Sequence, residues 1–385
     1  MPAVPAAPAA PGAPVVPATN VTFNLARDYS GPNFFNGWDF YGSWDNLTLS
    51  NVWWVDQPTA ATDQLAYVNQ AGNAIIRVDN TTNVPDQGAD TRRNTIRITT
   101  HDFYDFGSLW VFDAKHVPYG CTVWPAFWTK GPVWPDNGEI DILEAVNLMT
   151  YNQMAIHTTD GCQTSNQIQQ SGQLGSADCA SNSGCTVREL KPNSYGDDFN
   201  NAGGGVWATK FDVDGVAIWF WSRPDVPPEL TGDDKTVDIS KWGEPSAAFP
   251  VSPQCDITKF FTPQQLVIDI ALCGVWAGPT GNYQQTCPGV CDVSGAGSPA
   301  FDKAWFEIQY VRAYTTGVVP TPTPSAASGA AGSATATSTA TAISGQQAHG
   351  GSKSGAAGGR TRGRSAGAVA VALSVVAGVL LAISA

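Results

Sequence analysis

Basic residues are scarce in this chain of 385 residues. Its 20 Lys and Arg face 33 Asp and Glu, which gives a formal net charge of -13. A protein with a pI near 4.6 has little positive charge to offer to phosphates, so this composition argues against nucleic-acid binding. The chain is nevertheless 43% hydrophobic and 10% aromatic, which excludes a disordered protein and indicates a packed core.

Helical periodicity is also missing between residues 19 and 315, where no long segment repeats apolar residues at helical spacing. Short alternating or β-branched runs occur instead, separated by Gly, Pro, Asn and Asp. They predict strands at 74–78, 94–99, 108–114, 139–144, 153–158, 206–213, 216–221, 266–272 and 305–314. The turn Asp212-Val-Asp-Gly-Val216 joins two of them. With no internal repeat, we expect one all-β sandwich of two packed antiparallel sheets.

The eight cysteines lack the paired spacing with histidine that binds zinc. They all fall in the expected folded part and are even in number, which favours disulfides and an oxidising compartment. Their pairing is left open. Asn20, Asn46 and Asn80 each begin an acceptor tripeptide for N-glycosylation, which also favours a secreted protein.

The two ends differ from the middle. Residues 1–18 form a Pro/Ala-rich spacer without the charged start and long apolar run of a signal peptide. After a domain at 19–316 come a Ser/Thr/Gly/Ala-rich linker at 317–357 and, at 358–385, a basic spacer with an apolar tail. That order predicts a glycosylphosphatidylinositol (GPI) anchor signal, with a retained membrane helix or a cytosolic tail anchor as alternatives. We expect an extracellular monomer that meets the membrane only through this tail.

Three carboxylates lie within six residues of one predicted strand: Glu139, Asp141 and Glu144. Simple alternation turns Glu139 and Asp141 to one face and turns Glu144 to the other. One extra residue near 142–143, a β-bulge, would bring Glu144 back to the same face. Crowded carboxylates repel one another, which raises the pKa of at least one and keeps it protonated as an acid.

The alternative is a solvated sheet face, where acidic residues also alternate. The neighbourhood argues against that interpretation, because Trp124, Phe127, Trp128 and Trp134 crowd the approach to the carboxylates. Aromatic faces stack on the apolar faces of sugar rings and are costly to expose without a ligand.

The segment Gly120-Cys-Thr-Val-Trp-Pro-Ala-Phe-Trp128, followed by Trp134-Pro-Asp-Asn-Gly-Glu-Ile-Asp-Ile-Leu-Glu144, resembles glycoside hydrolase family 16. The resemblance is to the fungal endo-1,3(4)-β-glucanase and laminarinase branch, and it extends over roughly residues 20 to 315. It implies a concanavalin-like β-jelly roll whose concave cleft binds β-glucan. It also implies retaining hydrolysis of internal β-1,3 or mixed β-1,3/1,4 linkages, without a metal or an organic cofactor. A β-glucan transglycosylase and a non-catalytic carbohydrate-binding sandwich are the alternatives.

Carried onto matching positions, the resemblance makes Glu139 the nucleophile and Glu144 the general acid/base, with Asp141 tuning the nucleophile. Substrate contacts are expected from Trp124, Trp128, Trp134, Asn137, His157 and Trp276. Asn137 has a second interpretation, as the residue that holds the turn, and His157 as a structural residue. Val275 stands where fungal relatives often have Asp. Trp219 and Trp221 share one strand face and are expected to pack in the core.

Overall fold

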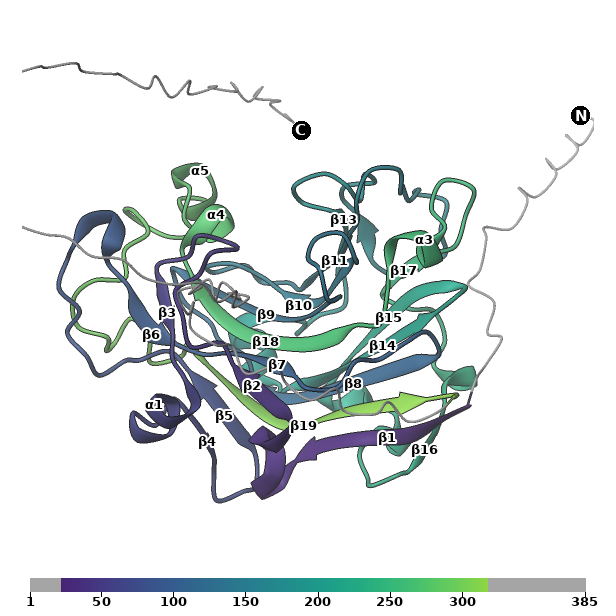
Figure 1. Ribbon diagram of the computed structural model, residues 1–385, viewed down its shortest axis with the longest axis horizontal. Coiled ribbons are helices and arrows are strands. Elements are labelled where there is room, and N and C mark those ends of the chain that lie inside the picture. The colour runs from purple at the N-terminus through teal and green to yellow at the C-terminus, as the bar shows by residue number, and fades with distance from the viewer. Residues whose placement is uncertain (1–21, 318–385) are drawn as a thin grey trace, which may run out of the picture. The chain divides into compact units, whose positions relative to one another are not determined.

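Two large antiparallel sheets make up the fold in the computed structural model, which describes residues 22–317 (Figure 1). The nine-stranded sheet runs β16-β1-β19-β8-β14-β15-β17, with β5 also on β19 and β4 on β5. The eight-stranded sheet runs β12-β13-β11-β10-β9-β18-β7-β2. A third, two-stranded sheet joins β3 and β6 in parallel. The expected all-β sandwich is confirmed.

The nine-stranded sheet comprises β1 (Thr22–Ser30), β4 (Ala66–Val68), β5 (Ala74–Arg77), β8 (Ser108–His116), β14 (Gly205–Asp212), β15 (Gly215–Ser222), β16 (Thr236–Asp238), β17 (Ala247–Pro250) and β19 (Trp305–Thr315). The eight-stranded sheet comprises β2 (Trp38–Phe40), β7 (Arg97–Thr100), β9 (Val123–Lys130), β10 (Glu139–Glu144), β11 (Gln153–His157), β12 (Gln173–Leu174), β13 (Cys185–Arg188) and β18 (Gln265–Leu272). The small sheet holds β3 (Val52–Trp54) and β6 (Arg93–Thr95).

Helices within the described residues are short. The α-helices are α1 (Gln57–Thr62), α2 (Gly196–Asn201), α3 (Ile257–Phe260), α4 (Gly274–Ala277) and α5 (Thr280–Tyr283). The 3₁₀ helices are η1 (Gly31–Gly37), η2 (Gly88–Asp90), η3 (Arg223–Asp225), η4 (Pro228–Leu230) and η5 (Ile239–Lys241). Among residues 22–317, no helix is both long and apolar enough to cross a bilayer. The predictions for residues 1–18 and for the linker and tail beyond residue 317 lie outside the described part.

The predicted strands are present, with one correction. Residues 94–99 are not one strand, because the chain breaks at Ile96 between β6 and β7. β6 pairs with β3, whereas β7 pairs with β18 and β2, so the two halves of this segment belong to two different sheets. The predicted turn between β14 and β15 is confirmed, with Asp212 opposite Gly215.

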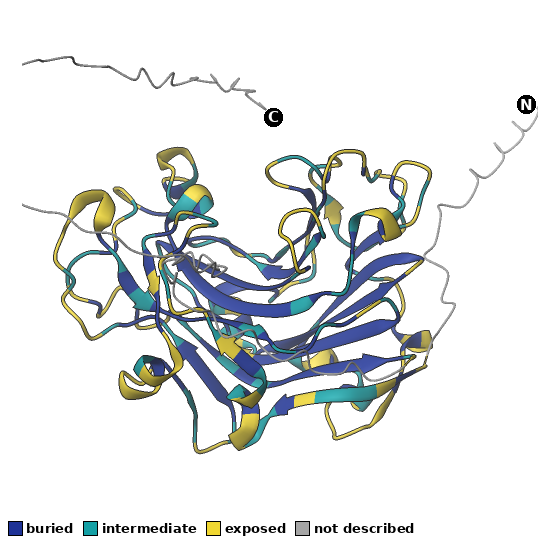
Figure 2. Ribbon diagram, in the orientation of Figure 1, coloured by how far each residue is buried: buried dark blue, intermediate teal, exposed yellow. Residues whose placement is uncertain are grey.

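The main core lies between the two large sheets, whose strands appear dark blue in Figure 2. Phe112 of β8 and Phe127 of β9 stack across it, with ring centroids 4.4 Å apart. Ile140, Ile142 and Leu143 of β10 are fully buried in the same cluster. Burying side chains of this size stabilises the fold by roughly 1.5–3 kcal/mol each, so β10 is anchored by its apolar residues.

A second apolar cluster covers the outer face of the nine-stranded sheet. Along β14, Val206 and Ala208 belong to this cluster, whereas Trp207 and Phe211 belong to the main core. Trp219 and the half-buried Trp221 pack here against Trp242, with centroids 5.4 and 5.0 Å away. Their predicted packing role is confirmed, although the cluster lies outside the sandwich.

All eight cysteines form disulfides: Cys121–Cys287, Cys162–Cys255, Cys179–Cys185 and Cys273–Cys291. The prediction of a disulfide-bonded domain is therefore confirmed. Cys179 and Cys185 are close in the sequence and bond to each other, whereas Cys287 and Cys291, which are also close, do not. Cys287 and Cys291 instead tie their loop to two different segments.

Candidate active site

The carboxylate strand β10 contains the predicted bulge. Its pairing with β9 places Asp141 opposite Trp128 but Leu143 opposite Phe127, so Ile142 is the extra residue. Both Ile142 and Leu143 then point into the core, and Glu144 returns to the face of Glu139 and Asp141. The three carboxylates therefore share the face of the eight-stranded sheet that is turned away from the core.

A cleft of about 640 Å³ opens over these carboxylates, which is the usual size of a ligand site. Strands β9, β10, β11, β18 and β7 contribute its floor, and these strands are neighbours in the sheet (Figure 1). The structure brings together in this lining all but one of the site residues predicted from the sequence: Glu139, Asp141, Glu144, Trp124, Trp128, Trp134, His157 and Trp276.

Glu144 is held from two sides. Its Oε1 accepts a hydrogen bond of 2.8 Å from Nε1 of Trp124, and its backbone N–H donates to Oδ1 of Asn152 at 2.9 Å. Burial, followed by the charge of Asp141, raises the pKa of Glu144 well above its usual range. The protonated form of Glu144 is therefore favoured in this setting.

Glu139 lies at the start of the same strand and accepts a hydrogen bond from Nε1 of Trp134. Burial, with the charge of Asp141, raises its pKa to about 8, while His157 and the Trp134 hydrogen bond act in the opposite direction. Burial and Asp141 outweigh these two groups, so the net effect is to disfavour the ionised form of Glu139.

His157 on β11 lies opposite Glu139 in the strand register. Its Nε2 is 3.2 Å from Oδ2 of Asp141, a carboxylate that is almost fully buried. Burial alone lowers the pKa of His157, but the hydrogen bond and charge of Asp141, with the two glutamates, raise it to about 9. His157 is thus a cation at neutral pH and balances part of the carboxylate charge.

Side-chain donor atoms of Glu139, Asp141 and His157 lie within 4.8 Å of one another, a spacing that a metal ion could also use. Protonated His157 is a poor metal ligand, because both ring nitrogens then carry a proton and Nε2 forms an ion pair with Asp141. The expectation of no metal and no cofactor stays a prediction.

The tryptophans differ in their surroundings. Trp128 is nearly buried, and its Nε1 donates to Oδ2 of Asp269 at 3.0 Å. Trp276 packs edge-on against Trp124, with centroids 5.6 Å apart. Trp134 is 44% exposed, so its ring is open to a ligand in the cleft.

A family model described as the XgeA-like, catalytic GH16 domain matches residues 38–314. The chain belongs to glycoside hydrolase family 16. It is 35% identical over 301 residues to a probable glycosidase of Schizosaccharomyces pombe, covering 76% of this chain and 69% of that protein. It is also 35% identical over 314 residues to the endo-1,3(4)-beta-glucanase of Emericella nidulans, covering 77% and 48%. The chain thus spans less than half the length of several curated relatives that it matches.

Two solved family 16 structures are similar to this one. Laminarinase 16A from Phanerochaete chrysosporium, with β-glucans in its donor and acceptor sites, has a TM-score of 0.72 and 33% identity. An elongating family 16 β-1,3-glucosyltransferase has a TM-score of 0.69 and 34% identity. Each comparison covers 76% of this chain and 100% of the other. The jelly-roll expectation is confirmed by this match.

Asn137 is the predicted site residue that the structure does not place in the lining of the family 16 cleft. Its Oδ1 accepts from the backbone N–H of Val133 at 2.9 Å, and its own carbonyl accepts from Nε2 of Gln264. These bonds commit the residue to the turn before β10. The turn-holding interpretation is the one that the geometry supports.

Three charged cleft residues, Asp45, Arg97 and Asp269, were missed from the sequence. Asp269 lies on β18 opposite Arg97 of β7, and burial raises the pKa of Asp269 to about 7 although Arg97 and Trp128 lower it. The Arg97 guanidinium lies over the rings of Trp128 and Tyr41, 5.1 and 4.9 Å from their centroids. An acidic residue inside the apolar run 266–272 was a usable signal for Asp269, but no local pattern marks Arg97.

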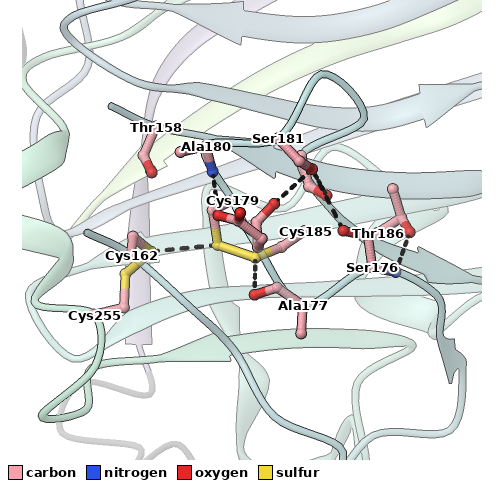
Figure 3. The surroundings of a disulfide bond; sticks show 12 residues. Thr158, Cys162, Ser176, Ala177, Cys179, Ala180, Ser181, Cys185, Thr186 and Cys255 are labelled. Atoms are coloured by element: carbon pink, nitrogen blue, oxygen red, sulfur yellow. Dashed lines mark hydrogen bonds between the residues drawn. A yellow bond between two sulfur atoms is a disulfide. The ribbon is translucent and has the colours of Figure 1, made fainter. Parts of the chain in front are cut away.

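A disulfide-closed loop forms the wall beside His157. The Cys179–Cys185 bond closes it, and a sulfur of the neighbouring Cys162–Cys255 bond lies 3.3 Å from the sulfur of Cys179 (Figure 3). A Cβ on Gly184 would meet the His157 ring at 3.0 Å, so the loop packs directly on that histidine. Asn182 and Ser183 at its tip line the cleft.

Proposed function

We propose that this family 16 domain is a retaining endo-glycosidase that hydrolyses internal β-1,3 or mixed β-1,3/1,4 linkages of β-glucan. The observation that carries the proposal is the bulge at Ile142, which sets three carboxylates on one face beneath an open cleft. Tryptophan rings in the same cleft suit the apolar faces of glucose units. The names of the curated relatives support the substrate class.

In this proposal the reaction is a double displacement. Glu144 donates its proton to the glycosidic oxygen while a carboxylate oxygen of Glu139 attacks the anomeric carbon. The leaving chain departs, and a covalent glycosyl-enzyme remains. Glu144, now ionised, takes a proton from water, and the water oxygen displaces Glu139 with net retention of configuration.

The division of labour between the two glutamates follows from their neighbours. Glu139 shares a cluster with the His157 cation and accepts a Trp134 hydrogen bond, and both favour its ionised form. Glu144 lies outside that cluster, so the proton shared by the crowded carboxylates belongs on Glu144. Asp141 holds His157 in place and thereby acts as a positioning residue for the nucleophile.

The test is a product profile on laminarin, lichenan and a β-1,6-branched β-1,3-glucan, with the anomer of the first product followed by NMR. We expect internal cleavage of at least one unbranched polymer and initial release of the β-anomer. Initial release of the α-anomer, or release of monosaccharide from chain ends alone, would overturn the proposal.

A transglycosylase is the second candidate, since one similar structure is an elongating β-1,3-glucosyltransferase. The glycosyl-enzyme on Glu139 would then pass to a sugar hydroxyl instead of water. Laminari-oligosaccharides at high concentration distinguish the two, because products longer than the substrate identify transfer.

We further propose that the enzyme acts outside the cell as a monomer held by a GPI anchor. Four disulfides support an oxidising compartment, and the composition of residues 317–385 supports the anchor. Phosphatidylinositol-specific phospholipase C should release the protein from intact cells. Protein that stays on the cells after that treatment would contradict the anchor.

A further inference from the structure

Two exposed tryptophans lie outside the cleft lining. Trp44 and Trp53 have 46% and 44% of their surface exposed. An isolated antiparallel bridge makes them cross-strand partners, so their side chains leave the backbone on the same face. Within the described residues, no aromatic ring contact involves either one. Large aromatic groups exposed side by side in this way usually mark a binding surface.

Asn94 lies next to this pair of tryptophans. Strands β3 and β6 lie side by side (Figure 1), and in their parallel pairing Trp53 is the partner of Asn94. The residues on either side of these two are buried in both strands. Asn94 lines a second pocket of about 310 Å³ together with Gln87, Asp90 and Arg92. Hydrogen-bonding groups therefore adjoin the aromatic pair.

These polar groups suit an uncharged partner. No hydrogen bond within residues 22–317 engages the side-chain amides of Asn94 and Gln87. Arg92 and Asp90 face each other, with Nη1 3.4 Å from Oδ1, so these two charges offset each other. The third charged side chain of the pocket, Asp79, is buried, and its Oδ1 accepts hydrogen bonds from two backbone N–H groups. Aromatic faces beside free amides are the combination that binds the apolar face and the hydroxyls of a sugar.

The same segment forms a wall of the catalytic cleft. Asp45 and Trp54, the immediate neighbours of the two exposed tryptophans, line the cleft, as do Leu47 and Thr48. One side of the segment 44–54 thus contacts the cleft, and the other side carries Trp44 and Trp53. A polysaccharide is long enough to contact both sides at once.

We propose that Trp44, Trp53 and the pocket at Asn94 form a second β-glucan-binding surface that holds the enzyme on the polymer. This inference takes its ligand class from the proposed function of the cleft. The role proposed for this surface is to hold the polymer, and cleavage is assigned to Glu139 and Glu144 in the cleft.

The test uses the full chain with Glu139→Gln, so that polymer is not consumed, and measures its binding to insoluble β-1,3-glucan particles. Adding Trp44→Ala with Trp53→Ala should raise the Kd about tenfold, as expected for losing two stacking contacts. The matched control is Leu190→Ala, because Leu190 is also an exposed apolar residue, at 56%. Trp44→Tyr with Trp53→Tyr should restore most of the binding.

In the active enzyme, the double alanine variant should keep its kcat/KM on short soluble laminari-oligosaccharides and lose turnover on the particles. Unchanged particle binding would overturn the proposal. So would an equal loss on particles and oligosaccharides, which would place the tryptophans in the cleft. A lower Tm or an altered oligomeric state with unchanged particle binding would identify the chain itself as the occupant, and would also overturn it. If the active chain hydrolyses no β-glucan but binds the particles through Trp44 and Trp53, the proposed function fails and the surface stands.

Discussion

Two faces of the large sheets carry tryptophans that point away from the space between the sheets, and one of these two faces is covered. On the nine-stranded sheet, Trp219 and Trp221 lie beneath residues 223–246 and pack on Trp242 from that segment. On the eight-stranded sheet, Trp124 and Trp128 face the cleft together with three carboxylates. Aromatic residues on a strand therefore do not show whether its face forms a cleft or a second core. That depends on whether another segment of the chain covers the face.

The covered face should contribute to stability and the open face to chemistry. Buried polar and charged groups cost stability unless they are well paired. The open face accepts that cost at Glu139 and Glu144, whose raised pKa values show that their ionised forms are disfavoured there. Five predictions test this difference, beginning with the largest effect.

Glu139→Ala should lower hydrolysis by about 10⁴-fold or more, since Glu139 is the group proposed to form the covalent intermediate. Azide should restore turnover and yield a glycosyl azide of inverted configuration, which NMR detects. Glu144→Ala should retain activity on aryl glycosides with good leaving groups. Near-full activity of both variants on laminarin would rule out the mechanism.

The same open face should gain stability when Glu144 becomes Gln. Its folded pKa lies above the unfolded value, so its protonated form is favoured by folding and the advantage is lost as the pH rises through the folded pKa. Thermal unfolding at pH 7 should therefore show a higher Tm for Glu144→Gln than for the wild type. At pH 4 the two should converge, because both states are then mostly protonated.

Trp242→Ala, on the covered face, should lower stability and leave activity unchanged. Trp242 is 8% exposed, and its Nε1 donates to Glu229 at 2.8 Å, so removing it opens a cavity over Trp219 and Trp221. A loss of about 3 kcal/mol is expected in urea unfolding, with KM and kcat unchanged at temperatures where the variant is folded. The matched change in the cleft is Trp276→Ala, which should raise KM and cost less stability. Equal effects of the two variants on KM would contradict the comparison.

His157→Ala should move the acid limb of the pH profile. The cation lowers the pKa of Glu139, so its removal raises that pKa and shifts the acid limb of kcat/KM upward by about one pH unit. His101→Ala is the control, since His101 pairs with Asp39 outside the cleft lining and should leave the profile unchanged. An unshifted acid limb in His157→Ala would mean that the histidine is structural.

Features set by neighbouring residues could be predicted from the sequence, whereas features set by pairing between distant segments could not. The carboxylate spacing predicted the bulge because alternation alone could not place Glu144. β9 was not predicted as a strand, because both of its faces are buried or aromatic and it shows no alternation. Arg97 and Asp269 meet across two strands, and this register is set by long-range pairing rather than by any local pattern.

The cleft wall at residues 179–185 was equally beyond prediction, since eight cysteines allow many pairings and the sequence does not choose among them. The Cys179–Cys185 bond and the contact of Gly184 with His157 help to place Asn182 over the cleft. The local sequence pattern thus identified the reacting carboxylates. The walls of the cleft above them depend on pairings between segments that are distant in the sequence.

The smallest effect is expected at that wall. Asn182→Ala removes an exposed amide from the cleft and should raise KM for the polymer about threefold with kcat unchanged, the size of one solvent-exposed hydrogen bond. Stability should change by less than about 0.5 kcal/mol, because the disulfide and not Asn182 holds the loop. Gln167→Ala is the control, as Gln167 lies on the same connection between β11 and β13 but outside the lining. If Asn182→Ala and Gln167→Ala give the same KM, the loop tip does not contact substrate, and the wall then serves only to hold His157.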